Sequence, residues 1–149
     1  MRKRGLRSVY IILILGMVPC LACAKHDPQP APDAATVLKA LAPADPAKLP
    51  ALDSKKHWSN PYLVIRPQTV GLLTDATANE EQLLKPEEVL NALAQLPKTA
   101  WPYGRAVAVL VDTKPANSEE EKIALRRNRG IVAGELENAQ ITIDWVPSS

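Results

Sequence analysis

Three basic side chains in the last third of the chain have the spacing of a binding face. Lys122, Arg126 and Arg129 are separated by four and three residues, so a helix would carry them on one side. Like charges at these spacings destabilise an isolated helix by a few tenths of a kcal/mol for each pair. That cost is better tolerated where an anion or an acidic partner lies against the face. We therefore interpret Arg126 and Arg129 as candidate partner-binding residues, with a plain solvated face as the alternative.

An acid stands at the end of the most apolar segment of the chain. Residues 105–112 run Arg-Ala-Val-Ala-Val-Leu-Val-Asp, which is typical of a central strand buried on both faces. Open α/β sheets bind their ligands beyond the carboxyl ends of such strands. Asp112 is therefore a candidate ligand-binding or partner-binding residue, and its alternative role is to turn the chain into the next loop.

Aromatic residues are few, and two of them stand in one short loop. The chain contains no Phe, and Trp101, Tyr103 and Arg105 fall within five consecutive residues. Trp, Tyr and Arg are the residue types that most often anchor protein interfaces. We expect Trp101, Tyr103 and Arg105 either to form a binding edge or to close the core at one end of the sheet.

The residue types that catalysis and metal binding require are sparse. His26 and His57 are the only histidines, and both cysteines fall within the first 23 residues. A catalytic triad or a zinc site needs a positioned imidazole or several clustered ligands. We expect no metal, no cofactor and no catalytic activity. An enzyme is retained as an alternative only if carboxylates such as Asp112 and Asp144 converge in a cleft.

The N-terminus has the three-part pattern of an export signal. Residues 2–7 carry four basic and no acidic groups, residues 9–18 are predominantly apolar, and small residues follow Pro19. An apolar run of about ten residues is half of the roughly 20 that a membrane-spanning helix needs. The pattern predicts a signal peptide over residues 1–24 and a location in the periplasm or on the outer face of a bacterial membrane. A retained membrane anchor is the lesser alternative.

Two routes of processing remain open. Cleavage after Ala24 would release a soluble chain. Leu21-Ala22-Cys23 instead resembles the lipobox of bacterial lipoproteins, which implies that Cys23 becomes the lipidated first residue. Either route removes the basic groups of the signal and leaves 14 basic against 16 acidic groups, a net charge of −2. Nucleic acid is not an expected partner of such a chain, because it selects strongly basic domains.

Beyond the signal, the composition predicts two parts. Residues 25–56 are rich in Pro and Ala and poor in large apolar side chains, which predicts a disordered tether. Residues 57–149 predict a small α/β domain, similar to an α+β sandwich, with the order β(β)αβαβ. Its mixed sheet is expected to have three to four strands and two helices, both on one face. The expected strands cover residues 61–66, 69–73, 105–112 and 140–146, and the expected helices cover residues 86–96 and 118–138.

Two partial resemblances to envelope families accompany this pattern. Asp112 and the run Leu125-Arg126-Arg127-Asn128-Arg129-Gly130 resemble part of the peptidoglycan-binding OmpA-like domain, in which a strand-end Asp and a helix Arg hold the peptide. That resemblance implies cell-wall binding through Asp112 and Arg129. The order of strands and helices also resembles the periplasmic domain of ExbD/TolR-type transport accessories. We expect an exported, non-catalytic envelope protein that binds another protein or acts as an accessory module, with a peptidoglycan-binding module as the alternative.

Overall fold

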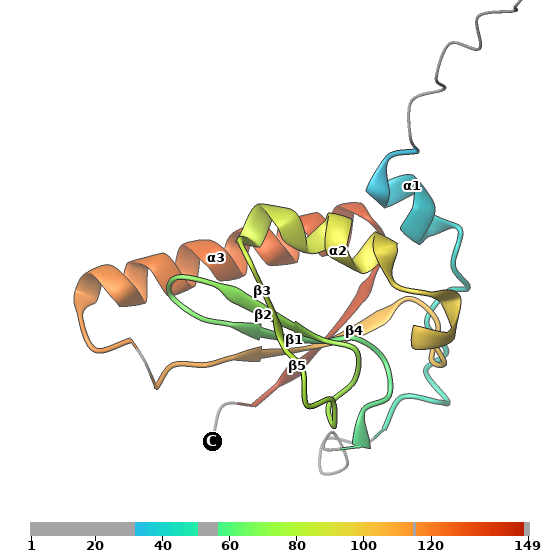
Figure 1. Cartoon of the computed structure of the whole chain (residues 1–149), viewed down its shortest axis with the longest axis horizontal. Helices are drawn as coiled ribbons and strands as arrows, with labels where there is room; N and C mark the ends of the chain where they lie inside the picture. The colour runs from blue at the N-terminus through green and yellow to red at the C-terminus, as the bar shows by residue number, and fades with distance from the viewer. Residues whose placement is uncertain (1–31, 51–56, 115, 148–149) are drawn as a thin grey trace, which may run out of the picture. The chain divides into compact units, whose positions relative to one another are not determined.

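A five-stranded mixed sheet forms the centre of the structure, which is a computed structural model (Figure 1). The structure describes residues 32–50, 57–114 and 116–147. The predicted signal peptide, Cys23 and the two ends of the predicted tether (25–31 and 51–56) lie outside the described residues. In the spatial order β3-β2-β1-β4-β5, the strands are β3 Gln82–Leu84, β2 Val70–Leu73, β1 Tyr62–Ile65, β4 Ala106–Val111 and β5 Thr142–Val146.

The sheet has an antiparallel half and a parallel half. β1 pairs antiparallel with β2, and β2 pairs antiparallel with β3. β4 and β5 each follow a helix, and such a crossover brings the chain back in the same direction, so β1, β4 and β5 run parallel. The carboxyl ends of these three strands, at Ile65, Val111 and Val146, therefore lie at one edge of the sheet.

The predicted α/β class is confirmed, but the predicted number of strands is wrong. The sheet has five strands where three to four were expected, and the unexpected one is β3. β3 is three residues long, its Leu83 side chain is 62% exposed, and a polar stretch precedes it. A strand this short has no alternation of apolar and polar residues that a sequence pattern could detect.

The described residues contain three α-helices, one more than predicted: α1 Ala34–Lys39, α2 Val89–Gln95 and α3 Glu119–Asn138. A 3₁₀ turn, η2 (Pro86–Glu88), leads into α2, and a second, η3 (Lys98–Ala100), follows it. Within these described ranges, no helix is long and apolar enough to cross a membrane.

Helix α3 begins directly after Ser118, where the expected helix starts, and a capping box closes its first turn. Ser118 Oγ accepts a hydrogen bond from the Glu121 backbone N–H at 3.2 Å, and Glu121 Oε2 accepts one from the Ser118 N–H at 3.1 Å. The backbone N–H groups of Asn117 and Ser118 hold the pKa of the Glu121 carboxyl below its usual value. The cap fixes where the helix starts and therefore which residues face the sheet.

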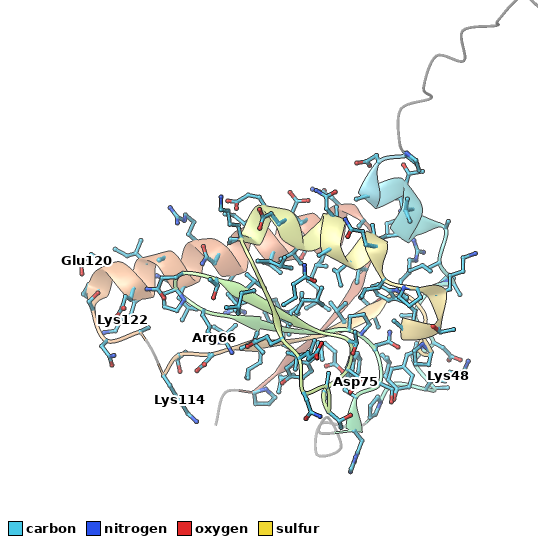
Figure 2. All side chains as sticks on the ribbon, in the orientation of Figure 1. Lys48, Arg66, Asp75, Lys114, Glu120 and Lys122 are labelled. Carbon is cyan, nitrogen blue, oxygen red and sulfur yellow. The ribbon has the colours of Figure 1, made fainter. Side chains whose placement is uncertain are left out.

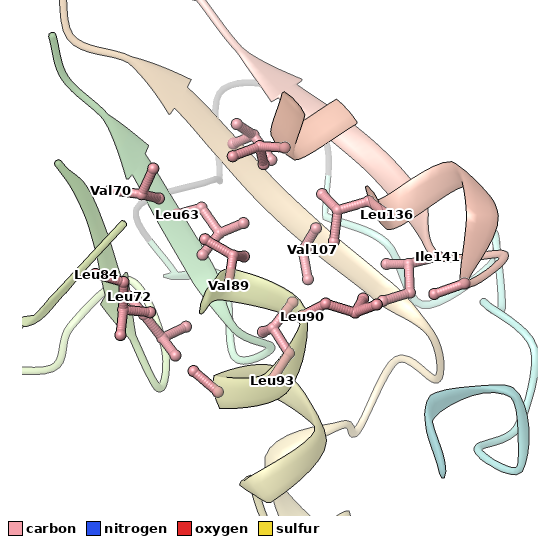
Figure 3. Packing of buried hydrophobic residues seen from close by; sticks show 14 of the residues in the cluster. Leu63, Val70, Leu72, Leu84, Val89, Leu90, Leu93, Val107, Leu136 and Ile141 are labelled. Atoms are coloured by element: carbon pink, nitrogen blue, oxygen red, sulfur yellow. The ribbon is translucent and has the colours of Figure 1, made fainter. Parts of the chain in front are cut away.

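The main core lies between one face of the sheet and all three helices. Alternate strand residues such as Leu63 and Val107 belong to one cluster with Leu93 of α2 and Leu136 of α3, and Figure 3 shows these side chains between the strands and the helices. Both predicted helices therefore cover the same face, as expected. A smaller cluster, centred on Trp58, covers part of the opposite face over Ala106 and Ala108.

Residues 32–50 correct the predicted tether, because they pack against the domain. The Leu38 side chain of α1 is 1% exposed and belongs to the main core, where α1 lies against α2. The Ala42 carbonyl accepts a hydrogen bond from the Arg105 N–H at 2.9 Å, and Asp45 N–H donates to the Tyr103 carbonyl at 3.0 Å. The compact unit therefore includes the described residues 32–50 and does not begin at His57. The six-residue helix, too short to be stable alone, is stabilised by packing on α2.

Candidate functional site

An open cavity of about 260 Å³ lies between α3 and the end of β4. Two of the predicted site residues, Arg126 and Arg129, line it together with Lys122. The remaining walls come from Val111, Thr113 and Leu125. We call this the α3 cavity. The sequence-predicted basic face therefore borders a hollow rather than a flat surface.

The cavity owes its basic walls to the way α3 is docked. Leu125 is 6% exposed and packs into the main core, and Asn128, one turn further on, is 2% exposed. Asn128 Nδ2 donates to the carbonyls of Arg66 and Pro67 at 2.9 and 3.0 Å, which ties the helix to the turn after β1. With positions 125 and 128 turned inward, helical periodicity places residues 122, 126 and 129 on the flank of the helix, around the cavity.

The three cationic side chains differ in their contacts with the rest of the described structure. Lys122 Nζ lies 2.7 Å from Glu119 Oε1, an exposed pair one turn apart. The Arg129 guanidinium lies over the Trp145 ring, with Cζ 4.5 Å from the ring centroid. Arg126 forms no ion pair with any acid that the structure describes. Figure 2 places Lys122 and the exposed Lys114 at the same end of the sheet, where β4 runs into α3.

Asp112 lies on the other face of the sheet from this cavity. Its Oδ2 is 3.6 Å from Arg66 Nε, and Arg66 Nη1 is 2.8 Å from Glu81 Oε1. The Glu81 carboxylate covers Gly71, where a Cβ atom would overlap it. The structure therefore brings Asp112 together with Arg66 and Glu81, and it does not bring Asp112 together with Arg129.

The loop of Trp101, Tyr103 and Arg105 is largely built into the fold. Trp101 is 5% exposed and belongs to the main core. Tyr103 meets Trp58 edge to face, with the ring centroids 5.3 Å apart. Arg105 Nη1 donates to the Lys39 carbonyl and to Gln140 Oε1, both at 3.4 Å. Of the two expected roles, the structure favours closure of the core at one end of the sheet.

The buried side-chain amide of Asn60, which reasoning from the sequence missed, holds this loop. Asn60 is 0% exposed, and its Nδ2 donates to the carbonyls of Gly104 and Ala106 at 2.8 and 2.7 Å. Its Oδ1 accepts from the Tyr103 N–H at 2.9 Å. Gly104 has φ 76°, and a Cβ there would overlap the Pro43 carbonyl, so the turn requires glycine.

A larger hollow, of about 610 Å³, lies beside the loop at residues 74–82 and offers weaker chemistry. Its polar walls include Glu80, Asn79 and Thr74, and Leu72 and Leu96 contribute the apolar part. It combines one sign of charge, from Glu80 and Glu81, with exposed loop side chains. Across the ranges that the structure describes, no three His, Cys, Asp or Glu side chains lie close enough together to hold a metal ion.

Comparison with known proteins adds no relative: no family description, no curated protein and no solved structure matches the chain. The site residues therefore stand on the geometry alone. Val111, Thr113 and Leu125 were missed as cavity residues. Leu125 could have been found from its position, three residues after Lys122 and one before Arg126. This spacing places an apolar residue on the buried face of the helix, next to the basic residues.

Proposed function

We propose that this chain is an exported, non-catalytic protein of the bacterial cell envelope that binds another protein through the surface around the α3 cavity. Its proposed location is the periplasm or the outer face of a bacterial membrane. Cys23 is the lipid attachment point if the chain is processed as a lipoprotein. The observation that supports the binding role is that three cationic side chains and two aliphatic ones line a single cavity at the carboxyl end of β4. Interface anchors of this kind combine Arg with a desolvated pocket.

Cell-wall binding through Asp112 and Arg129 is the less favoured alternative. Those two side chains lie on opposite faces of the sheet, and the Asp112 carboxylate is engaged by Arg66. A sedimentation assay with purified peptidoglycan tests it: binding that is lost in both Asp112→Ala and Arg129→Ala would restore this alternative.

The proposed location is tested by fusing residues 1–31 to alkaline phosphatase that lacks its own signal peptide. This enzyme becomes active only outside the cytoplasm. We expect an active fusion, and mass spectrometry of the released N-terminus then distinguishes a lipidated Cys23 from a chain starting at Lys25. An inactive fusion with an intact Met1 would overturn the export proposal.

Partner binding is tested by photo-crosslinking in intact cells. A photoreactive amino acid replaces Ile123 of α3, which is 58% exposed beside the basic flank. The matched control replaces Leu83 of β3, which is similarly exposed at 62% but lies on the edge strand. We expect a protein adduct of defined mass from position 123 and none from position 83. Adducts of equal yield from both positions would contradict binding through α3.

A further inference from the structure

We infer that the α3 cavity accepts a carboxylate carried beside an aliphatic side chain, presented by an acidic segment of the partner protein. This inference rests on the proposed function and names the chemistry of the partner. Three features of the cavity determine that chemistry: a cation without an ion partner among the described residues, apolar lining residues, and a volume that fits one side chain.

The unpaired cation supplies the anion specificity. Among the acids that the structure describes, Glu119 lies on Lys122 and Asp112 lies on Arg66, so neither neutralises Arg126. Arg126 is exposed and borders the cavity, which leaves its planar guanidinium available. A guanidinium binds a carboxylate through two parallel N–H···O bonds, and such charge-assisted bonds are about twice as strong as neutral ones.

A second cation, Arg129, is held in place at the same cavity and can also bind the anion. The Trp145 ring lies under the Arg129 guanidinium, and this stacking limits the rotamers of a long side chain. The stacking occupies one face of the guanidinium and leaves its N–H edge for hydrogen bonding. An arginine that is already ordered loses less conformational entropy when it binds an anion. Arg126 and Arg129 lie three residues apart along α3, so both border one site.

The floor of the cavity selects for an aliphatic neighbour. Val111 and Leu125 line it together with the cations, and Leu125 also belongs to the main core. A volume of about 260 Å³ is below the roughly 300–1,000 Å³ of a pocket for a drug-sized ligand. The space fits one aliphatic side chain with its adjoining carboxylate.

The charge around the cavity argues against a polyanion. The exposed acids Glu119 and Glu120 stand at the start of α3, within one turn of Lys122. Recognition of an anionic lipid surface usually needs a cluster of about four to eight basic residues, whereas three line this cavity. The exported chain also carries more acidic than basic groups. A single carboxylate of a protein segment suits this arrangement better than a membrane or a nucleic acid.

The test uses four small probes on the isotope-labelled protein, purified in its exported form. N-acetyl-leucine carries the carboxylate and the aliphatic side chain together, N-acetyl-leucinamide lacks the charge, acetate lacks the side chain, and inorganic phosphate supplies a different anion. Backbone amide resonances of Thr113, Leu125 and Arg126 report the cavity. We expect N-acetyl-leucine to shift them along a saturable curve with a dissociation constant on the order of 1–10 mM, which is usual for a ligand of this size.

The variants separate a specific contact from general attraction by charge. Arg126→Ala removes the unpaired cation, and we expect it to weaken N-acetyl-leucine binding at least about tenfold, the loss typical of one charge-assisted hydrogen bond. Arg127→Ala is the matched control, because it removes the same charge from the next position of the same helix without touching the cavity. It is expected to leave binding within about twofold, since exposed charges contribute little.

Three results would overturn the inference. They are the absence of a saturable shift at the reporting amides, equal shifts with N-acetyl-leucinamide, and tighter binding of phosphate than of N-acetyl-leucine. Failure of this probe test together with a specific crosslink from position 123 would refute the carboxylate chemistry and leave the partner-binding proposal standing. Absence of the crosslink together with successful probe binding would do the reverse.

Discussion

Replacement of Asn60 by Ala tests how the fold holds the loop before β4. The Asn60 side chain is fully buried and makes three hydrogen bonds, two donated to carbonyls of Gly104 and Ala106 and one accepted from the Tyr103 N–H. Each bond contributes about 1 kcal/mol net, and a buried polar group left without a partner costs about 1–3 kcal/mol. We expect Asn60→Ala to reduce the free energy of unfolding by about 3–5 kcal/mol, a large part of the roughly 5–15 kcal/mol typical of a domain.

Urea denaturation followed by tryptophan fluorescence measures this loss. Trp58 and Trp101 lie in the two clusters that the loop joins, so their emission reports the unfolding of both. With a slope of about 1–3 kcal/mol per molar urea, the midpoint should fall by about 2 M. The matched control is Asn91→Ala in α2, an exposed Asn in a helix, which should be neutral or slightly stabilising.

Equal midpoints for the two variants would refute the reasoning. That result would mean that the three buried groups find other partners, and that the loop is positioned by packing of its aromatic rings alone. A fall in the denaturation slope without a fall in midpoint would instead indicate a change in compactness, and it would also contradict the predicted mechanism.

Three further predictions concern the local features that build the domain. Leu38→Ala should lower the free energy of unfolding by about 2–5 kcal/mol, as truncations of buried Leu do. The control Val37→Ala, at a position 36% exposed, should cost little. Equal losses for the two variants in thermal unfolding would mean that α1 does not pack on the domain. Gly71→Ala should displace the Glu81 carboxylate and change the free energy of unfolding by less than about 1 kcal/mol in either direction, because the displaced side chain is flexible and alanine is favoured over glycine in a strand by about 0.5–1 kcal/mol. A loss like that of Leu38→Ala in the same assay would show that the backbone itself must shift. Ser118→Ala should cost about 1 kcal/mol by removing the cap of α3, and hydrogen exchange should rise in the first turn of that helix rather than throughout it.

The long elements were predictable because their patterns are local. β4 is apolar on both faces, and its boundaries differ by one residue at each end from the expected segment. Ser118, followed three residues later by Glu121, indicates the start of α3, and the structure has a capping box there. β3 and the packing of α1 on the domain were not predictable, because neither is determined by a local pattern of sufficient length. Their stability comes from partners distant in sequence: β2 for the strand and the α2 surface for the helix.

The candidate site was predictable in its charge and not in its geometry. Helical spacing alone groups Arg126 with Arg129, and the structure places both around one cavity. The sequence does not indicate which face of the sheet the helices cover, because β4 is apolar on both faces. In the structure Val111 packs with the main core on the α3 side, and the alternation of side chains along the strand leaves Asp112 on the opposite face, beside Arg66. Trp101 likewise belongs to a core that includes Leu38 of α1, a helix in the segment that composition assigned to the tether.

The proposed contact between α3 and a partner is tested most sharply by one crosslinking yield. The photoreactive residue at position 123 is expressed in three backgrounds: the otherwise unchanged chain, Arg126→Ala and Arg127→Ala. We predict one protein adduct whose yield falls about tenfold or more in Arg126→Ala, as expected for the loss of one charge-assisted contact, and is unchanged in Arg127→Ala. An adduct that forms equally in all three backgrounds, or in none, would contradict binding at this cavity.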